Sequence, residues 1–298
     1  MTRLNQQFTL PDGRRLGYDE HGELDGHPIF YFHGTPSARV EWAFFATPEL
    51  VQSLHLRVIA VDRPGLGRSD FQSHRRMTDW PQDVCALANH LRLDHFAVIG
   101  YSGGSPYAAA CAALIPERLS AVGLVGVIGP FDRPELTAGI PPQNLRFLNA
   151  SRDRPWLARL IQRMMSLLAR LAPDRMIAQA LTALPLPDQL VLAQPKARQA
   201  FLTMLQEAVR SGTRGPQVDS ALMVSPWGFD PTTISIPVYL WKGAKDQNAP
   251  LAMAHYLSGA IPLSRLTVYP DDGHLSIIAN HAEEIFTTIA GTHQQHLS

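Results

Sequence analysis

The most restrictive feature of this 298-residue sequence is an alternation of short apolar runs with segments of helical spacing. Each run has the length of a strand that is buried on both faces of a parallel sheet. The first runs lie at residues 29–32, 57–61, 96–99 and 121–127, with helical segments between them at residues 80–91 and 106–115. This alternation predicts a wound, mostly parallel α/β sheet with helices on both faces.

The alternation stops between residues 131 and 225. This stretch contains no convincing strand, and prolines separate its segments of helical apolar spacing. Its clearest helical segments are residues 156–171, 174–184 and 197–209. We therefore interpret residues 131–225 as a helical lid that is inserted into the α/β core.

Strands and helices resume after the insertion. Further strands are expected at residues 238–241 and 266–269, and further helices at residues 251–258 and 281–289. A hairpin is expected at the start of the chain, where two β-rich runs, residues 6–10 and 14–19, flank the turn signal Pro11-Asp12-Gly13. The prediction is an eight-stranded core formed by residues 1–130 and 226–298.

Composition excludes several classes of function. Lys and Arg number 26, as do Asp and Glu, so the net charge is zero and nucleic-acid binding is not expected. Two cysteines, Cys85 and Cys111, are too few for a disulfide framework or a four-cysteine zinc site. The N-terminus lacks the apolar core of a signal peptide, and the most apolar run, residues 119–129, is far shorter than the ~20 residues of a membrane span. We expect a cytoplasmic protein without a membrane span, and the sequence leaves a homo-oligomer open.

A serine at a predicted strand–helix junction is the first candidate for chemistry. The junction reads Gly100-Tyr101-Ser102-Gly103-Gly104, which is a G-x-S-x-G pattern. The pattern alone is weak, but here it follows an apolar strand and precedes an alanine-rich helical run, which is the setting of a nucleophile elbow. Small residues permit the tight turn, and the helix N-terminus favours developing negative charge. We interpret Ser102 as a candidate nucleophile.

A serine nucleophile needs a histidine base and an acid that orients the histidine. His274 and Asp246 each lie just beyond a predicted strand, at the end where open α/β sheets bind their ligands. The chain order Ser102, Asp246, His274 is the order expected for a triad on such a sheet. Asp132, which follows the predicted strand at residues 121–127, is an alternative for the acid, and the Gly-x-x-Asp context favours Asp246.

Backbone amides complete the predicted site. The strand at residues 29–32 ends in His33-Gly34-Thr35-Pro36, and amides at such a strand end can point toward the serine. We expect an oxyanion hole formed by the amides of Thr35 and Gly103, the residue after the nucleophile. His33 is expected to have a structural role in its loop.

Five motifs in this order resemble those of the α/β-hydrolase superfamily. They are His33-Gly34-Thr35-Pro36, Asp62-Arg63-Pro64-Gly65-Leu66-Gly67-Arg68-Ser69, Gly100-Tyr101-Ser102-Gly103-Gly104, Gly243-Ala244-Lys245-Asp246 and Gly273-His274. The resemblance covers nearly the whole chain outside the insertion. It implies a serine nucleophile, a histidine base, an aspartate partner, a helical lid over the site and no cofactor or metal.

These features predict a serine hydrolase of the carboxylesterase type that cleaves a small-molecule ester or a related acyl compound. Epoxide hydrolases and haloalkane dehalogenases resemble this layout but use an aspartate where this chain has Ser102. The same site also suits an aminopeptidase, a C–C bond hydrolase, an acyltransferase or a perhydrolase, although the shortage of acidic lid residues argues against the aminopeptidase. A ligand sensor with a hydrolase-like pocket is the alternative from another class.

The predicted lid is net basic, with 12 Lys and Arg residues against 7 Asp and Glu residues. Arginines such as Arg159, Arg163 and Arg170 are interpreted as a solvated helix face, and contact with an anionic substrate is the alternative. The large apolar lid side chains are expected to pack the lid against the core, with some lining an apolar pocket. Among them are Phe147, Trp156, Met164, Met165 and Met204.

Overall fold

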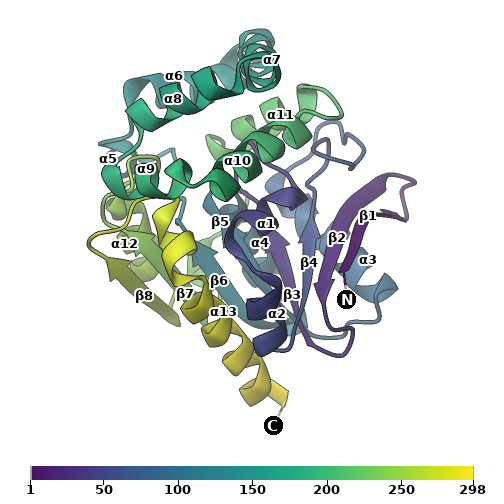
Figure 1. Cartoon of the computed structure of the whole chain (residues 1–298). Coiled ribbons are helices and arrows are strands. Elements are labelled where there is room, and N and C mark those ends of the chain that lie inside the picture. The colour runs from purple at the N-terminus through teal and green to yellow at the C-terminus, as the bar shows by residue number, and fades with distance from the viewer. Residues whose placement is uncertain (1, 298) are drawn as a thin grey trace.

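The structure is a computed structural model that describes residues 2–297, with side chains described as far as residue 292. An eight-stranded sheet in the order β1-β2-β4-β3-β5-β6-β7-β8 forms its centre (Figure 1). β2 is antiparallel to β1 and β4, and the other pairings are parallel. The strands are β1 (Thr2–Thr9), β2 (Arg15–Gly22), β3 (His27–Phe32), β4 (Leu56–Val61), β5 (Phe96–Tyr101), β6 (Leu119–Val125), β7 (Val238–Gly243) and β8 (Ser264–Tyr269). The predicted mostly parallel, eight-stranded sheet is confirmed.

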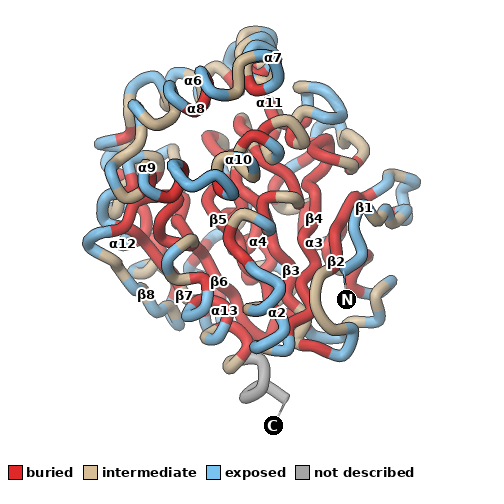
Figure 2. The backbone as a smooth tube through the Cα atoms, in the orientation of Figure 1, coloured by how far each residue is buried: buried red, intermediate tan, exposed pale blue. Residues whose placement is uncertain are grey.

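Helices cover both faces of the sheet because the central strands are apolar on both sides. Phe30 and Phe32 of β3 face the cluster that includes α3 and α4, whereas Tyr31 faces the opposite cluster with α1, α2 and α13. The tube in Figure 2 is red along these strands, which marks them as buried. The core helices are α1 (Trp42–Phe45), α2 (Pro48–Ser53), α3 (Trp80–His90), α4 (Ser105–Leu114), α12 (Leu251–Ala260) and α13 (Ser276–Leu297), with 3-10 turns at η1 (Arg39–Glu41), η2 (Met77–Asp79), η3 (Ser102–Gly104), η4 (Pro116–Arg118) and η5 (Pro231–Thr233).

An all-helical insertion separates β6 from β7, as the sequence predicts. Its helices are α5 (Pro134–Thr137), α6 (Pro142–Asp153), α7 (Pro155–Leu171), α8 (Pro173–Ala183), α9 (Leu186–Ala193), α10 (Pro195–Ala208) and α11 (Arg214–Met223). α9, α10 and α11 lie next to the core, whereas α6, α7 and α8 form the part farthest from the sheet (Figure 1). Most of these helices have a proline near their start. Proline fits there because the N–H groups of the first helical turn have no acceptor within the helix, so the missing N–H of proline costs no hydrogen bond.

The predicted helical segments at residues 156–171, 174–184 and 197–209 correspond to α7, α8 and α10, whereas α5, α6, α9 and α11 lie outside the predicted segments. Within residues 2–297, no helix has the length and apolar character needed to cross a membrane.

Candidate active site

Ser102 lies at the turn between β5 and α4, where the close approach of several backbones requires glycine on either side. A side chain on Gly100 would collide with the carbonyl group of Gly104, and a side chain on Gly104 would collide with the carbonyl oxygen of Phe32. Ser102 itself has a φ of 51°, in the left-handed region that non-glycine residues seldom adopt. This turn presents the hydroxyl at the carboxyl end of β5.

The structure brings Ser102, His274 and Asp246 together. His274 Nε2 lies 2.8 Å from Ser102 Oγ, and His274 Nδ1 lies 2.7 Å from Asp246 Oδ2. His274 lies in the loop between β8 and α13, and the hydroxyl of Tyr101 donates a hydrogen bond to its carbonyl oxygen. All three side chains are buried. Their order along the chain and their places beyond β5, β7 and β8 follow the arrangement expected from the sequence.

Asp246 is held as a carboxylate by four neighbouring donors. Its Oδ1 accepts hydrogen bonds from the backbone N–H groups of Asn248 and Ala249. Its Oδ2 accepts from His274 and from Lys242. Burial alone would raise the pKa of Asp246, but the charges and hydrogen bonds of His274 and Lys242 outweigh burial and lower it.

Lys242 is a functional candidate that the sequence analysis missed. Its ammonium group is fully buried at the end of β7, and Nζ lies 2.5 Å from Asp246 Oδ2. Burial lowers the pKa of Lys242, against the opposing effect of Asp246. The signal in the sequence is a lone charged residue in the apolar strand run that ends at Gly243.

The loops that carry Thr35 and Gly103 lie against each other beside the serine. A Cβ on Gly103 would approach to 3.1 Å of the Thr35 amide nitrogen, and a Cβ on Gly34 would lie 3.7 Å from Ser102 Oγ. The N–H of Gly34 donates to the buried carboxylate of Glu41, so it is not free for a ligand. The two amides expected to form the oxyanion hole therefore lie on neighbouring segments.

Arg63 holds the Thr35 loop in place. Its guanidinium donates to the carbonyl oxygens of His33 and Gly34 and to Thr35 Oγ1. His33 is fully buried, and its Nδ1 lies 2.8 Å from the Gly34 carbonyl oxygen. Burial, and then the charge of Arg63, lower the pKa of His33, which favours a neutral ring with a structural role.

The insertion supplies a carboxylate to this loop. Asp219 of α11 is fully buried and accepts hydrogen bonds from Arg63, Arg75 and the hydroxyls of Tyr107 and Thr35. Although burial opposes ionisation, the two arginines lower the pKa of Asp219 well below its usual value. Asp219 therefore connects the insertion to the loop that carries the Thr35 amide.

A second carboxylate of the insertion holds the loop that carries His274. Asp188 of α9 is fully buried and accepts hydrogen bonds from the backbone N–H groups of His274, Leu275 and Ser276 at 2.8–2.9 Å. These N–H groups are at the start of α13, where a carboxylate is favourable. Neither Asp188 nor Asp219 belongs to a recognisable motif, so sequence reasoning missed both.

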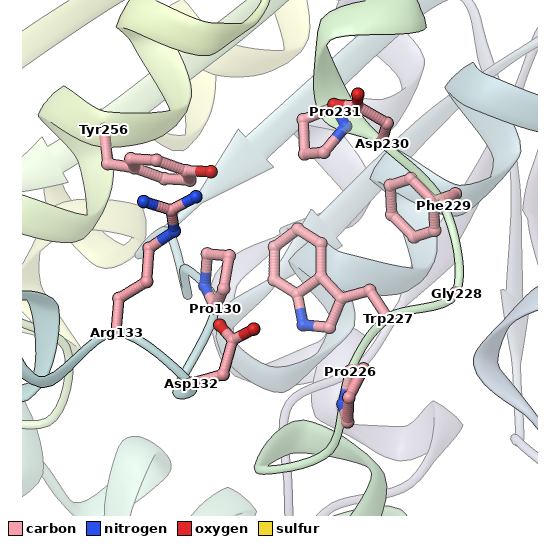
Figure 3. Close-up of a pocket in the computed structure, with 10 residues that line it drawn as sticks. All are labelled: Pro130, Asp132, Arg133, Pro226, Trp227, Gly228, Phe229, Asp230, Pro231 and Tyr256. Atoms are coloured by element: carbon pink, nitrogen blue, oxygen red, sulfur yellow. The ribbon is translucent and has the colours of Figure 1, made fainter.

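Asp132, the alternative acid, lies elsewhere. His274 bonds to Asp246, and no hydrogen bond joins Asp132 to His274 among the described residues. Asp132 instead lines an opening of about 530 Å³ with Trp227 and Tyr256, where the Arg133 guanidinium lies over the tyrosine ring (Figure 3).

Among the described residues, no cluster of His, Cys, Asp or Glu side chains is suited to a metal ion.

A wound α/β sheet with a serine, histidine and aspartate in contact at its strand ends is the arrangement of the α/β-hydrolase fold. The chain belongs to the alpha/beta hydrolase fold family, whose sequence profile matches residues 27–280.

Two curated relatives show how far the sequence similarity extends. The uncharacterized hydrolase YcgS of Bacillus subtilis is 25% identical over 297 residues, which cover 98% of this chain and 99% of that protein. A non-heme chloroperoxidase of Streptomyces lividans is 36% identical over 128 residues, or 41% of this chain, and the match spans only 44% of the chloroperoxidase.

Solved structures share the fold over nearly the whole chain. A thermophilic esterase from Thermogutta terrifontis superposes with a TM-score of 0.70 at 22% identity, covering 98% of this chain and 99% of that one. At this identity the likeness concerns the fold.

Proposed function

We propose that the protein is a serine hydrolase that cleaves a small-molecule ester or a related acyl compound through Ser102, His274 and Asp246. The observation that carries this proposal is the continuous contact from Asp246 Oδ2 through the imidazole to Ser102 Oγ, at 2.7 and 2.8 Å. Esterases are among the solved proteins that share this fold, so we propose an ester as the first substrate class to test.

In the proposed reaction, His274 Nε2 takes the hydroxyl proton as Ser102 Oγ attacks the carbonyl carbon. The N–H groups of Thr35 and Gly103 stabilise the negative oxygen of the tetrahedral intermediate. Asp246 holds the imidazole with its proton on Nδ1 and stabilises the imidazolium. His274 then protonates the leaving alcohol, and water activated by the same ring cleaves the acyl-enzyme.

Labelling with a fluorophosphonate tests the assignment of the nucleophile. The probe reacts with activated serines, so mass spectrometry is expected to find one adduct, on Ser102. The His274→Ala variant and heat-unfolded protein are expected not to react, since each lacks the activating base in position. An adduct on another serine would overturn the proposed site.

A screen of acyl substrates tests the alternative of a ligand sensor. Rapid multiple turnover would identify an enzyme.

The buried Lys242 predicts a specific pH effect. In Lys242→Met, Asp246 keeps its backbone donors but loses the ammonium that partly neutralises it. The protonated form of His274 then faces a more negative carboxylate and is stabilised. We expect the acidic limb of the kcat/KM profile to move to higher pH.

Lys245→Met is the matched control, because Lys245 is half-exposed and pairs with the exposed Asp271. Its profile is expected to coincide with that of the wild type. An unmoved acidic limb in Lys242→Met, in a folded variant, would show that the ammonium does not affect the imidazole.

Replacing Asp188 by alanine is expected to destabilise the loop that carries His274. Asp188→Ala leaves three buried N–H groups at the start of α13 without their acceptor, at a cost of about 2 kcal/mol or more in the free energy of unfolding. We expect kcat of Asp188→Ala to fall by a larger factor than KM rises, because His274 is displaced. Asp188→Asn is expected to retain part of the rate that Asp188→Ala loses. Asp174→Ala, at an exposed aspartate of α8, is the control for both urea unfolding and steady-state kinetics.

A further inference from the structure

α7 exposes a continuous apolar stripe. Its members, spaced three or four residues apart, are between 49% and 75% exposed: Trp156, Leu160, Met164, Leu167 and Leu171. Residues at this spacing share one side of a helix. The expectation that Trp156 and Met164 pack the lid against the core is therefore wrong.

The stripe points away from the rest of the molecule. The buried residues of α7 are Ala158, Gln162 and Ala169. At 100° per residue they lie on the side of the helix opposite the stripe, and on that side α7 packs against its neighbours in the insertion. Figure 1 places α7 at the end of the molecule farthest from the sheet, and Figure 2 marks it largely as exposed and half-buried. The stripe is thus an outer surface, with no partner among the described residues.

A strip of positive charge borders the stripe. Arg159, Arg163 and Arg170 follow one edge of it, and α7 contains no acidic residue. Within the described part of the chain, neither Arg163 nor Arg170 forms an ion pair. A second copy packed through α7 would bring two such strips together with no carboxylate on either helix to neutralise them. The charge pattern therefore favours a partner that is itself anionic and apolar.

We propose that α7 binds the surface of an anionic lipid membrane, with the stripe among the acyl chains and the arginines at the phosphate groups. A helix with Trp and Leu on one side and arginines beside them has the composition of an interfacial helix that lies in the plane of a membrane. Arginine stems extend over apolar surface while their charges reach the headgroups. α9 and α11, which hold the active-site loops through Asp188 and Asp219, lie on the core side of the insertion and need not move.

Trp156 offers a direct test. The other four tryptophans are at most 6% exposed, so quenching by brominated acyl chains reports on Trp156. With vesicles of phosphatidylcholine and phosphatidylglycerol, we expect the protein to float with the vesicles and its exposed tryptophan to be quenched. Pure phosphatidylcholine or high salt is expected to weaken both signals. Trp156→Phe should retain flotation and lose the quenching.

Variants separate the apolar and charged contributions. Leu160→Glu/Leu167→Glu is expected to lower vesicle partitioning at least tenfold, whereas Leu263→Glu, at a leucine 53% exposed on a core loop, leaves it unchanged. Arg163→Glu/Arg170→Glu should remove the preference for phosphatidylglycerol. Turnover of a water-soluble short ester should be unchanged in all of these variants, so the result is independent of the proposed reaction.

Three results would overturn the proposal. The first is wild-type protein that does not float with anionic vesicles. The second is equal flotation of the wild type and the double glutamate variant. The third is a concentration-dependent dimer in analytical ultracentrifugation that the same double variant abolishes, which would assign the stripe to a second copy of the chain.

Discussion

Ser102→Ala is expected to lower kcat/KM for a short aryl ester by roughly 10⁴-fold or more. The change removes the only protein atom that forms a covalent bond to the substrate in the proposed scheme, while His274 and Asp246 keep their mutual contact at 2.7 Å. Activity that persists would come from the oxyanion amides and from binding alone. The measurement is steady-state hydrolysis by purified variant, with titration of any fluorophosphonate-reactive contaminant.

Ser120→Ala is the matched control for that experiment. Ser120 is also buried, but its hydroxyl has no hydrogen-bond partner among the described residues, so its loss should alter neither rate nor folding. Near-wild-type hydrolysis by Ser102→Ala would exclude the proposed nucleophile, whatever the behaviour of the control.

The second large effect is expected at Asp219. In Asp219→Ala, the buried guanidinium groups of Arg63 and Arg75 lose their common counter-charge, and Thr35 loses a hydrogen-bond partner. Removing one partner of a buried ion pair costs about 3–5 kcal/mol, so the free energy of unfolding in urea should fall by that amount. Because Arg63 also holds the Thr35 loop, kcat/KM should fall further than the loss of folded protein explains.

Asp153→Ala serves as the control for Asp219, because Asp153 is an exposed aspartate of the insertion that forms a surface pair with Arg152. Surface pairs of this kind contribute roughly 0–1 kcal/mol. Unchanged unfolding of Asp219→Ala would mean that the two arginines find other partners, and the proposed support of the loop would then be wrong.

The sign of the pH effect at Asp219 follows from its pKa. Since the pKa of Asp219 in the folded protein lies below the ~3.9 of an unfolded aspartate, the folded state favours its charged form. Its contribution to stability is therefore fully present at neutral pH and decreases as the pH falls below the unfolded value. Wild-type protein should lose stability in acid more steeply than Asp219→Asn, as measured by urea unfolding at pH 3 to 7.

The sequence predicted the inner strands β3 to β7 well because they are mostly buried on both faces and read as continuous apolar runs. The positions of Ser102, Asp246 and His274 were predictable for a related reason, since each follows a predicted strand at the same end of the sheet. Local pattern and chain order were sufficient for these features.

Contacts between distant parts of the chain could not be predicted in this way. Asp188 meets the His274 loop from 86 residues away, and Asp219 meets Thr35 from 184 residues away. Nothing near either aspartate in the sequence marks it as buried. For α7, the helical spacing was clear, but only the packed structure shows that its apolar side faces outward.

The two aspartates also bear on how such proteins can be re-engineered. The insertion supplies carboxylates that hydrogen-bond to both the Thr35 loop and the His274 loop, so it cannot be exchanged as an independent unit. Transplanting a foreign segment between β6 and β7 to obtain new selectivity would deprive Arg63 and Arg75 of the carboxylate that they share. It would also deprive the N–H groups at the start of α13 of their acceptor. Chimeras that retain carboxylates equivalent to Asp188 and Asp219 should tolerate the exchange, and chimeras that lack them should not.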